Sequence, residues 1–178
     1  MMAPIPRAKG TASKPLDVGI VGTGYIAEFH ARAIQALPGA VLRSVCDPKP
    51  KTAQSFAANW GAHQAFDSLD AMLRDRPLDV LHVLVPPDLH YPLAKTALES
   101  GAHVFLEKPM CTSVTEADEL LATARDKGLR IGINHNFLYM GAYQRLREVV
   151  RSRMLRRQLW HAHSNCGGRC FDRAAFPL

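Results

Sequence analysis

The chain has 178 residues, which is enough for one domain or for one domain and part of a second. Its hydrophobic fraction of 47% allows a buried core and excludes a disordered chain, and no apolar run approaches the ~20 residues that cross a bilayer. Lysine and arginine (22) outnumber aspartate and glutamate (16), with an excess in the arginine-rich residues 144–158, which we interpret as a solvated helix face.

Strand-like and helix-like segments alternate along most of the chain. Residues 1–15 are basic without a following apolar block, which predicts a disordered tail and not a secretory signal. Strands are expected at residues 17–21, 41–46, 62–66 (the weakest), 80–85, 103–106 and 130–133. Helices are expected at residues 25–36, 51–60, 69–75, 91–99, 113–127 and 142–151. The alternation predicts an α/β fold, a doubly wound Rossmann-type parallel sheet with helices on both faces.

A glycine pattern joins the first strand to the first helix. Gly22, Gly24 and Ala27 form G-x-G-x-x-A, and this pattern gains its meaning from the strand before it and the helix after it. The first glycine permits a tight turn, the second lets a phosphate approach the backbone, and the alanine lets the helix pack close to the strand. The N–H groups of Tyr25 and Ile26 then point at an anion. The pattern predicts a pyrophosphate site.

An acidic residue that binds a ribose is expected at the end of the second strand. Asp47 stands there, about twenty residues after Ala27, which is the offset found in dinucleotide-binding folds. The alternative is that Asp47 merely caps the segment that begins at Pro48. A carboxylate repels a 2′-phosphate and so favours NAD, whereas Lys49 and Lys51 lie nearby and leave NADP open. The strand, turn, helix and acid together predict a dinucleotide site.

A second group of residues follows two later strands. Pro86 comes after one strand, and His90 opens the helix that follows it. Glu107, Lys108 and Pro109 end the next strand, so both groups should lie at the carboxyl edge of the sheet, where ligands bind. A lysine held there can exchange a proton with a substrate oxygen while hydride moves to nicotinamide. The alternative is that Lys108 is a surface lysine in a β–α loop.

The chain resembles the glucose–fructose oxidoreductase / inositol dehydrogenase / MocA (Gfo/Idh/MocA) family over about residues 16–151. The shared features are G-x-G-x-x-A, the acid after the second strand, P-x-x-x-H and, most specific, G-x-H-V-x-x-E-K-P at residues 101–109. The resemblance implies an NAD(P)-dependent oxidoreductase acting on a sugar, cyclitol or related polyol, with Lys108 as the catalytic proton-transfer residue. It places Glu107, Pro86 and His90 on the nicotinamide side, and Pro109 after a peptide bond that is often cis in relatives.

Several other polar residues are weaker candidates. Asn134 and His135 follow the last strand and should reach toward the substrate cleft, although loop polar residues often only tie down backbone. His30 and His82 carry no catalytic pattern, and we interpret His30 as a packing residue. We expect no metal site, because the H-x-H-x2-C-x3-C run of residues 161–170 matches no common zinc spacing.

The resemblance also implies a second α/β domain, which is missing or vestigial in this chain. We therefore divide the chain into a disordered tail (residues 1–15), an NAD(P)-binding Rossmann domain (16–151) and an atypical tail (152–178). The atypical tail is interpreted as the remnant of a truncated second domain, left by a genuine short protein or by a frame change. The rival to a sugar or polyol oxidoreductase is a non-catalytic dinucleotide-binding module or an inactive truncated fragment.

The expected partners follow from the same features. The substrate is expected to be a small sugar or polyol, with no nucleic acid and no membrane as partner, and exposed apolar surface predicts homo-oligomers or self-association. Cys46 and Cys111 stand alone in the main body, which is typical of reduced thiols in a cytoplasmic protein.

Overall fold

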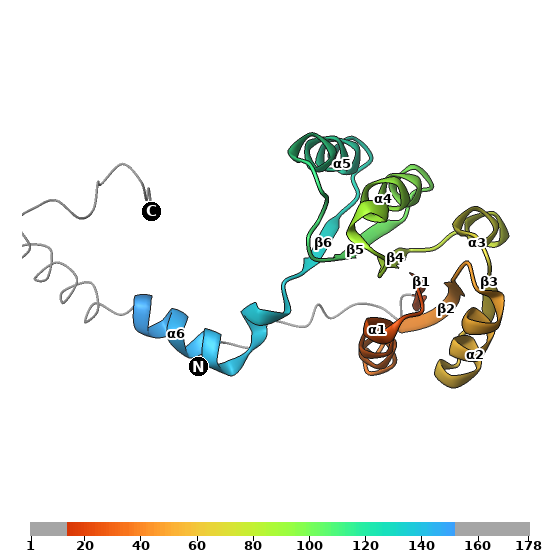
Figure 1. The fold of residues 1–178 in the computed structure, drawn as a ribbon, viewed down its shortest axis with the longest axis horizontal. Coiled ribbons are helices and arrows are strands. Elements are labelled where there is room, and N and C mark those ends of the chain that lie inside the picture. The colour runs from red at the N-terminus through yellow and green to blue at the C-terminus, as the bar shows by residue number, and fades with distance from the viewer. Residues whose placement is uncertain (1–13, 152–178) are drawn as a thin grey trace, which may run out of the picture. The chain divides into compact units, whose positions relative to one another are not determined.

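A computed structural model describes residues 14–151, and the part up to Asn134 forms a six-stranded sheet with helices on both faces (Figure 1). The strands are β1 (Leu16–Val21), β2 (Ala40–Cys46), β3 (Gln64–Phe66), β4 (Val80–Val83), β5 (His103–Glu107) and β6 (Ile131–Asn134). The α-helices are α1 (Tyr25–Gln35), α2 (Pro50–Trp60), α3 (Leu69–Asp75), α4 (His90–Glu99), α5 (Val114–Asp126) and α6 (Gly141–Arg151). Two short 3₁₀ helices are η1 (Pro87–Leu89) and η2 (Asn136–Tyr139).

The strands lie in the order β3-β2-β1-β4-β5-β6, and every neighbouring pair is parallel. The chain runs outward from β1 in one direction through β2 and β3, and in the other through β4, β5 and β6. The order therefore reverses between β1 and β4, and the loops that leave these two strands diverge there. Such a reversal opens a crevice at the carboxyl ends of the strands, which is where doubly wound folds bind nucleotides. The predicted fold class is confirmed.

The core lies on both faces of the sheet. Helices α1 and α2 cover one face and pack around Ile20 and Val45, whereas α3, α4 and α5 cover the other face around Leu81 and Leu106 (Figure 1). All four of these side chains are fully buried. Complete burial of such a side chain contributes roughly 1.5–3 kcal/mol, so the sheet is held by apolar packing on both sides. The near-continuous apolar pattern of the inner strands has this origin.

Most predicted elements agree with the observed ones to within a few residues, and the clearest difference is at β4. The apolar pattern predicts a strand to residue 85, but β4 ends at Val83. The Leu84 N–H still donates to the Val21 carbonyl (2.9 Å), and then the chain leaves the sheet. The Val85 carbonyl accepts a hydrogen bond from the His90 ring instead of joining a strand pair. The pattern of apolar residues could not predict this contact between Val85 and His90.

The chain divides into two compact units, of which the first ends at Asn134 and the second begins at His135. In the second unit, α6 exposes an apolar stripe made of Tyr143, Leu146 and Val150. No helix among residues 14–151 is long and apolar enough to cross a membrane. The interpretations of residues 1–13 and 152–178, including the candidate zinc run, concern parts of the chain outside the described residues. The predicted domain limits and the self-association stay predictions.

Candidate functional site

The turn after β1 has the backbone geometry that the glycine pattern predicts. Gly22 has a φ of +89°, and a Cβ placed on it would lie 2.4 Å from the carbonyl oxygen of Leu84. Its N–H donates to the Cys46 carbonyl at 2.8 Å. Gly22 therefore sits where the loops from β1, β2 and β4 converge, and only a residue without a side chain fits between them.

Gly24 plays a different part at the same turn. It is the residue before the first turn of α1, and its φ of −76° is open to any residue. A Cβ placed on it would meet no atom of residues 14–151 within 4 Å. The N–H groups of Tyr25 and Ile26 lie in the first helical turn and have no acceptor within the helix. Open space beside N–H donors at the positive end of a helix matches what a pyrophosphate requires. These residues fit a dinucleotide.

Asp47 follows β2 and is already oriented by hydrogen bonds. Its Oδ2 accepts from the Thr23 N–H (3.1 Å) and the Thr23 hydroxyl (2.8 Å), and its Oδ1 accepts from the Lys49 N–H (2.9 Å). Partial burial alone would raise the pKa of Asp47, but the hydrogen bonds from Lys49 and Thr23 outweigh burial and lower it. A carboxylate has about four acceptor positions, so an ionised Asp47 keeps one for a ribose hydroxyl.

Lys108 and its neighbours form the turn after β5. The Lys108 side chain is exposed, and no ion pair of its ammonium is found among residues 14–151. The Lys108–Pro109 peptide bond is cis, as the resemblance implied. The Lys108 N–H donates to Glu107 Oε2 at 3.3 Å, so the carboxylate of one residue anchors the backbone of the next.

Glu107 also belongs to a polar chain on the α1 face of the sheet. Its Oε1 accepts from Asn134 Nδ2 (2.6 Å) and from His30 Nε2 (3.1 Å). Burial alone would raise the pKa of Glu107, but hydrogen bonds from Asn134, His30 and the Lys108 N–H lower it overall. A carboxylate only accepts hydrogen bonds, which assigns a proton to His30 Nε2. Direct contact of Glu107 with the cofactor stays a prediction.

The polar chain continues from His30 to His82 in β4. Their Nδ1 atoms are 2.9 Å apart, so one of the two nitrogens donates to the other. Burial, and then the neighbouring His30, lower the pKa of His82 to about 3, so this ring is neutral near pH 7. Sequence reasoning missed His30 and His82 because their partners lie 52 and 77 residues away along the chain.

His90 stands at the start of α4 and is 1% exposed. Its Nδ1 lies 2.7 Å from the Pro109 carbonyl oxygen, and its Nε2 lies 2.9 Å from the Val85 carbonyl oxygen. The ring thus joins the loop after β4 to the turn after β5. Both ring nitrogens are thus engaged by backbone carbonyls, and direct contact of His90 with a cofactor stays a prediction.

The remaining predicted residues differ in their surroundings. Pro86 is exposed in the loop between β4 and η1. Asn134 ends β6 and donates to Glu107, which ties it to the Lys108 turn. His135 begins the second unit, where its carbonyl accepts from the Leu138 N–H at 3.0 Å. The structure therefore brings Asn134 together with Glu107 in the first unit, and the role of His135 stays a prediction.

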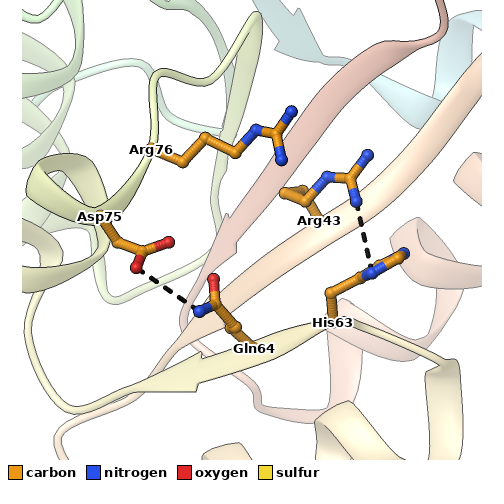
Figure 2. Close-up of a pocket in the computed structure, with 5 residues that line it drawn as sticks. All are labelled: Arg43, His63, Gln64, Asp75 and Arg76. Carbon is orange, nitrogen blue, oxygen red and sulfur yellow. Dashed lines mark hydrogen bonds between the residues drawn. The ribbon is translucent and has the colours of Figure 1, made fainter.

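A cavity of about 510 Å³ lies near the start of β3, away from this crevice (Figure 2). Its lining residues are Arg43, His63, Gln64, Asp75 and Arg76. Both guanidinium groups are paired with the buried carboxylate of Asp17, and Asp75 adds a further negative charge. Both lining arginines are thus already paired with a carboxylate, so neither indicates an anion site. Within residues 14–151, no group of three or more potential ligands is placed to hold a metal ion.

The reversed strand order, the glycine turn and the oriented Asp47 define a dinucleotide-binding Rossmann domain. Residues 16–135 match the family model described as "Oxidoreductase family, NAD-binding Rossmann fold". The chain therefore belongs to the Gfo/Idh/MocA family of oxidoreductases, as its motifs indicated. The cofactor class predicted from the sequence is confirmed at the level of this family.

Individual relatives agree with this assignment. The chain is 34% identical over 144 residues to D-glucoside 3-dehydrogenase of Escherichia coli (strain K12), a match that covers 80% of the chain and 41% of that protein. Among solved structures, GenD2 from gentamicin A biosynthesis in complex with NAD matches with a TM-score of 0.77 and 29% identity over 85% of the chain and 43% of GenD2.

A second solved structure carries the other nicotinamide cofactor. A variant of KijD10, a 3-ketoreductase from Actinomadura kijaniata, was solved with TDP-benzene and NADP, and it matches with a TM-score of 0.72 and 27% identity. This match covers 77% of the chain and 44% of KijD10. The chain thus spans less than half the length of each of these three relatives.

Proposed function

We propose that the chain binds NAD at the carboxyl ends of β1 and β4. It would thereby form the cofactor-binding part of an oxidoreductase that acts on a sugar, cyclitol or related polyol. The observation that carries this proposal is the open space at Gly24, beside the free N–H groups of the first turn of α1. The names of two relatives support it, because one is a D-glucoside 3-dehydrogenase and the other was solved with NAD. The substrate class rests on the first of these names.

The cofactor would lie along residues of the first unit. The N–H groups of Tyr25 and Ile26 would bind the pyrophosphate, Gly24 would leave room for it, and Asp47 would accept from a ribose hydroxyl. Bound there, the cofactor supplies the nicotinamide that takes or gives a hydride. NAD is favoured because the Asp47 carboxylate, held in place by Thr23, would repel a 2′-phosphate.

Lys108 would exchange a proton with the substrate oxygen whose carbon loses or gains the hydride. Its side chain is exposed, whereas its backbone N–H is anchored by the Glu107 carboxylate. General acid–base groups work when they are held within hydrogen-bond reach of the reacting oxygen. Pro86 and His90 would border the nicotinamide side, Asn134 would orient Glu107, and His135 would contact the substrate.

A titration and a turnover assay test this proposal together. NADH fluorescence should reveal binding by the wild-type chain and by Lys108→Ala with similar affinity, since Lys108 does not touch the pyrophosphate turn. Hydride transfer, measured by NADH absorbance with a panel of polyols and glucosides, should be lost in Lys108→Ala and kept in the control Lys127→Ala. Lys127 follows the last residue of α5, and its ammonium donates to the carbonyl of Glu99, the last residue of α4.

The outcomes separate the candidate functions. Equal turnover by the wild type and by Lys108→Ala would refute the proposed proton-transfer role of Lys108. NADH binding without turnover of any substrate would instead favour a non-catalytic dinucleotide-binding module. If neither nicotinamide cofactor bound, the dinucleotide site itself would be refuted.

A further inference from the structure

His90 has an unusual set of hydrogen-bond partners for a buried histidine. It is 1% exposed, and both of its ring nitrogens lie within 2.9 Å of backbone oxygens. These oxygens are the carbonyls of Val85 and Pro109, which come from the loops after β4 and β5. The ring therefore bridges two segments that neighbouring strands deliver to the same edge of the sheet.

The identity of the two partners decides the number of protons on the ring. A carbonyl oxygen can only accept a hydrogen bond, so each ring nitrogen must donate. A neutral imidazole has one N–H and one bare nitrogen, and only the imidazolium has two N–H groups. With one proton missing, the lone pair of a bare nitrogen would face a carbonyl lone pair at 2.7 or 2.9 Å. That arrangement is repulsive and leaves a buried acceptor without a partner.

We propose that His90 is held as a doubly protonated imidazolium that clamps the loop after β4 to the Lys108 turn. Burial and the positive end of α4 both disfavour a cation at this position. Two short, charge-assisted hydrogen bonds to carbonyl dipoles offset that cost, because such bonds are about twice as strong as neutral ones. The clamp is a positioning device, since the ring reaches the crevice only through Val85 and Pro109.

The clamp has a consequence for the proposed function, on which this part of the inference rests. Lys108 is bonded directly to Pro109, so the ring fixes the turn from the side opposite to Glu107. On its other side the ring holds Val85, in the loop that runs on to Pro86. The His90 ring therefore helps to fix the distance between the loop after β4 and the Lys108 turn.

Nitrogen NMR of the wild-type protein reads the proton count directly. We expect long-range ¹H–¹⁵N spectra of histidine-labelled protein near neutral pH to show two N–H nitrogens for His90, assigned by their absence in His90→Gln. His103 is an internal reference, because its Nδ1 accepts from the Arg130 backbone N–H (3.1 Å) and so carries no proton. A bare nitrogen on His90, with His103 behaving as stated, would overturn the proposal. This experiment needs no cofactor and so is independent of the proposed function.

The positioning role is tested with variants. His90→Gln presents amide hydrogens from one nitrogen only and cannot reach both carbonyls, so NADH affinity should fall by about tenfold or more. Amide hydrogen exchange should also accelerate at the residues of the two loops that carry an amide hydrogen, which are Leu84, Val85, Lys108, Met110 and Cys111. The control His63→Gln alters an exposed ring that accepts from Arg43 (3.3 Å) and should leave both readings unchanged. Two N–H nitrogens together with unchanged affinity and exchange in His90→Gln would refute the clamp as a positioning device. A wild-type chain without NADH affinity would instead count against the proposed function.

Discussion

Three glycine-to-alanine variants should separate the folding role of the cofactor turn from its binding role. Gly22 combines a φ of +89° with a Cβ position only 2.4 Å from the Leu84 backbone oxygen, so alanine meets both strain and a clash that no side-chain rotation relieves. Gly101 has a φ of +93° and open space around its Cβ position, so alanine there meets the strain alone. Gly24 has an ordinary φ and open space, and alanine meets neither.

The expected magnitudes follow from these three environments. The left-handed backbone costs an alanine about 1–2 kcal/mol, and the clash at Gly22 adds about 1–3 kcal/mol. Gly22→Ala should therefore lose about 3 kcal/mol of unfolding free energy and Gly101→Ala about 1 kcal/mol. Gly24→Ala should lose less than about 1 kcal/mol, the cost of replacing glycine at a helix N-cap. Its methyl group would enter the pyrophosphate space, so NADH affinity should fall by about tenfold or more.

Urea unfolding and NADH fluorescence titration measure the two quantities on the same samples. Gly101→Ala should bind NADH like the wild type, which makes it the control for a strained turn outside the crevice. Equal unfolding free energies for Gly22→Ala and Gly101→Ala would show that the Leu84 contact yields easily. Wild-type NADH affinity in Gly24→Ala would show that no phosphate lies against this backbone.

Two further predictions concern ionisable groups. Burial alone would raise the pKa of Asp17, but hydrogen bonds and charges from Arg43 and Lys14 lower it in the folded protein. The ionised Asp17 therefore contributes its full stability above the unfolded pKa of about 3.9. This contribution is lost as the pH falls through the pKa of Asp17 in the folded protein. Asp17→Asn should cost about 2 kcal/mol at pH 7, because it replaces the carboxylate that accepts from Arg43, and this cost should shrink as the pH falls below the unfolded pKa. A cost in urea unfolding that stays constant down to the acid-unfolding range would contradict the linkage. Burial, followed by the charges of Asp47 and Asp67, raises the pKa of the Cys46 thiol to about 11. Iodoacetamide at pH 8 should therefore label the less buried Cys111 before Cys46 in peptide maps. The reverse order would contradict the burial of the Cys46 thiol at the end of β2.

Local signals made the fold and the cofactor turn predictable. Gly22 and Gly24 lie within a few residues of the strand and helix that give them meaning, so the sequence alone indicated the tight turn and the open position. Asp47 was found through its fixed offset from the same turn. Each of these inferences depends on one strand–helix unit, whose geometry varies little among doubly wound folds.

Contacts that depend on the strand order could not be predicted from local sequence patterns. His30 meets Glu107 only because β1, β4 and β5 are neighbours in the sheet and α1 covers the face where both side chains point. Likewise, the two carbonyl partners of His90 belong to the ends of different strands. A motif located His90 and Glu107 near the crevice, but the direction in which their polar atoms point required the three-dimensional packing.

The hydrogen bonds between Asp47 and Thr23 couple cofactor choice to the integrity of the turn. Thr23 donates two hydrogen bonds to this carboxylate. Replacing Asp47 with a residue that tolerates a 2′-phosphate would therefore also remove the hydrogen bonds that join the loop after β1 to the end of β2. A switch from NAD to NADP should therefore require paired substitutions at positions 23 and 47. In evolutionary terms, the proposed preference for NAD would be protected by an epistatic barrier, since either single substitution would break the contact between the two loops.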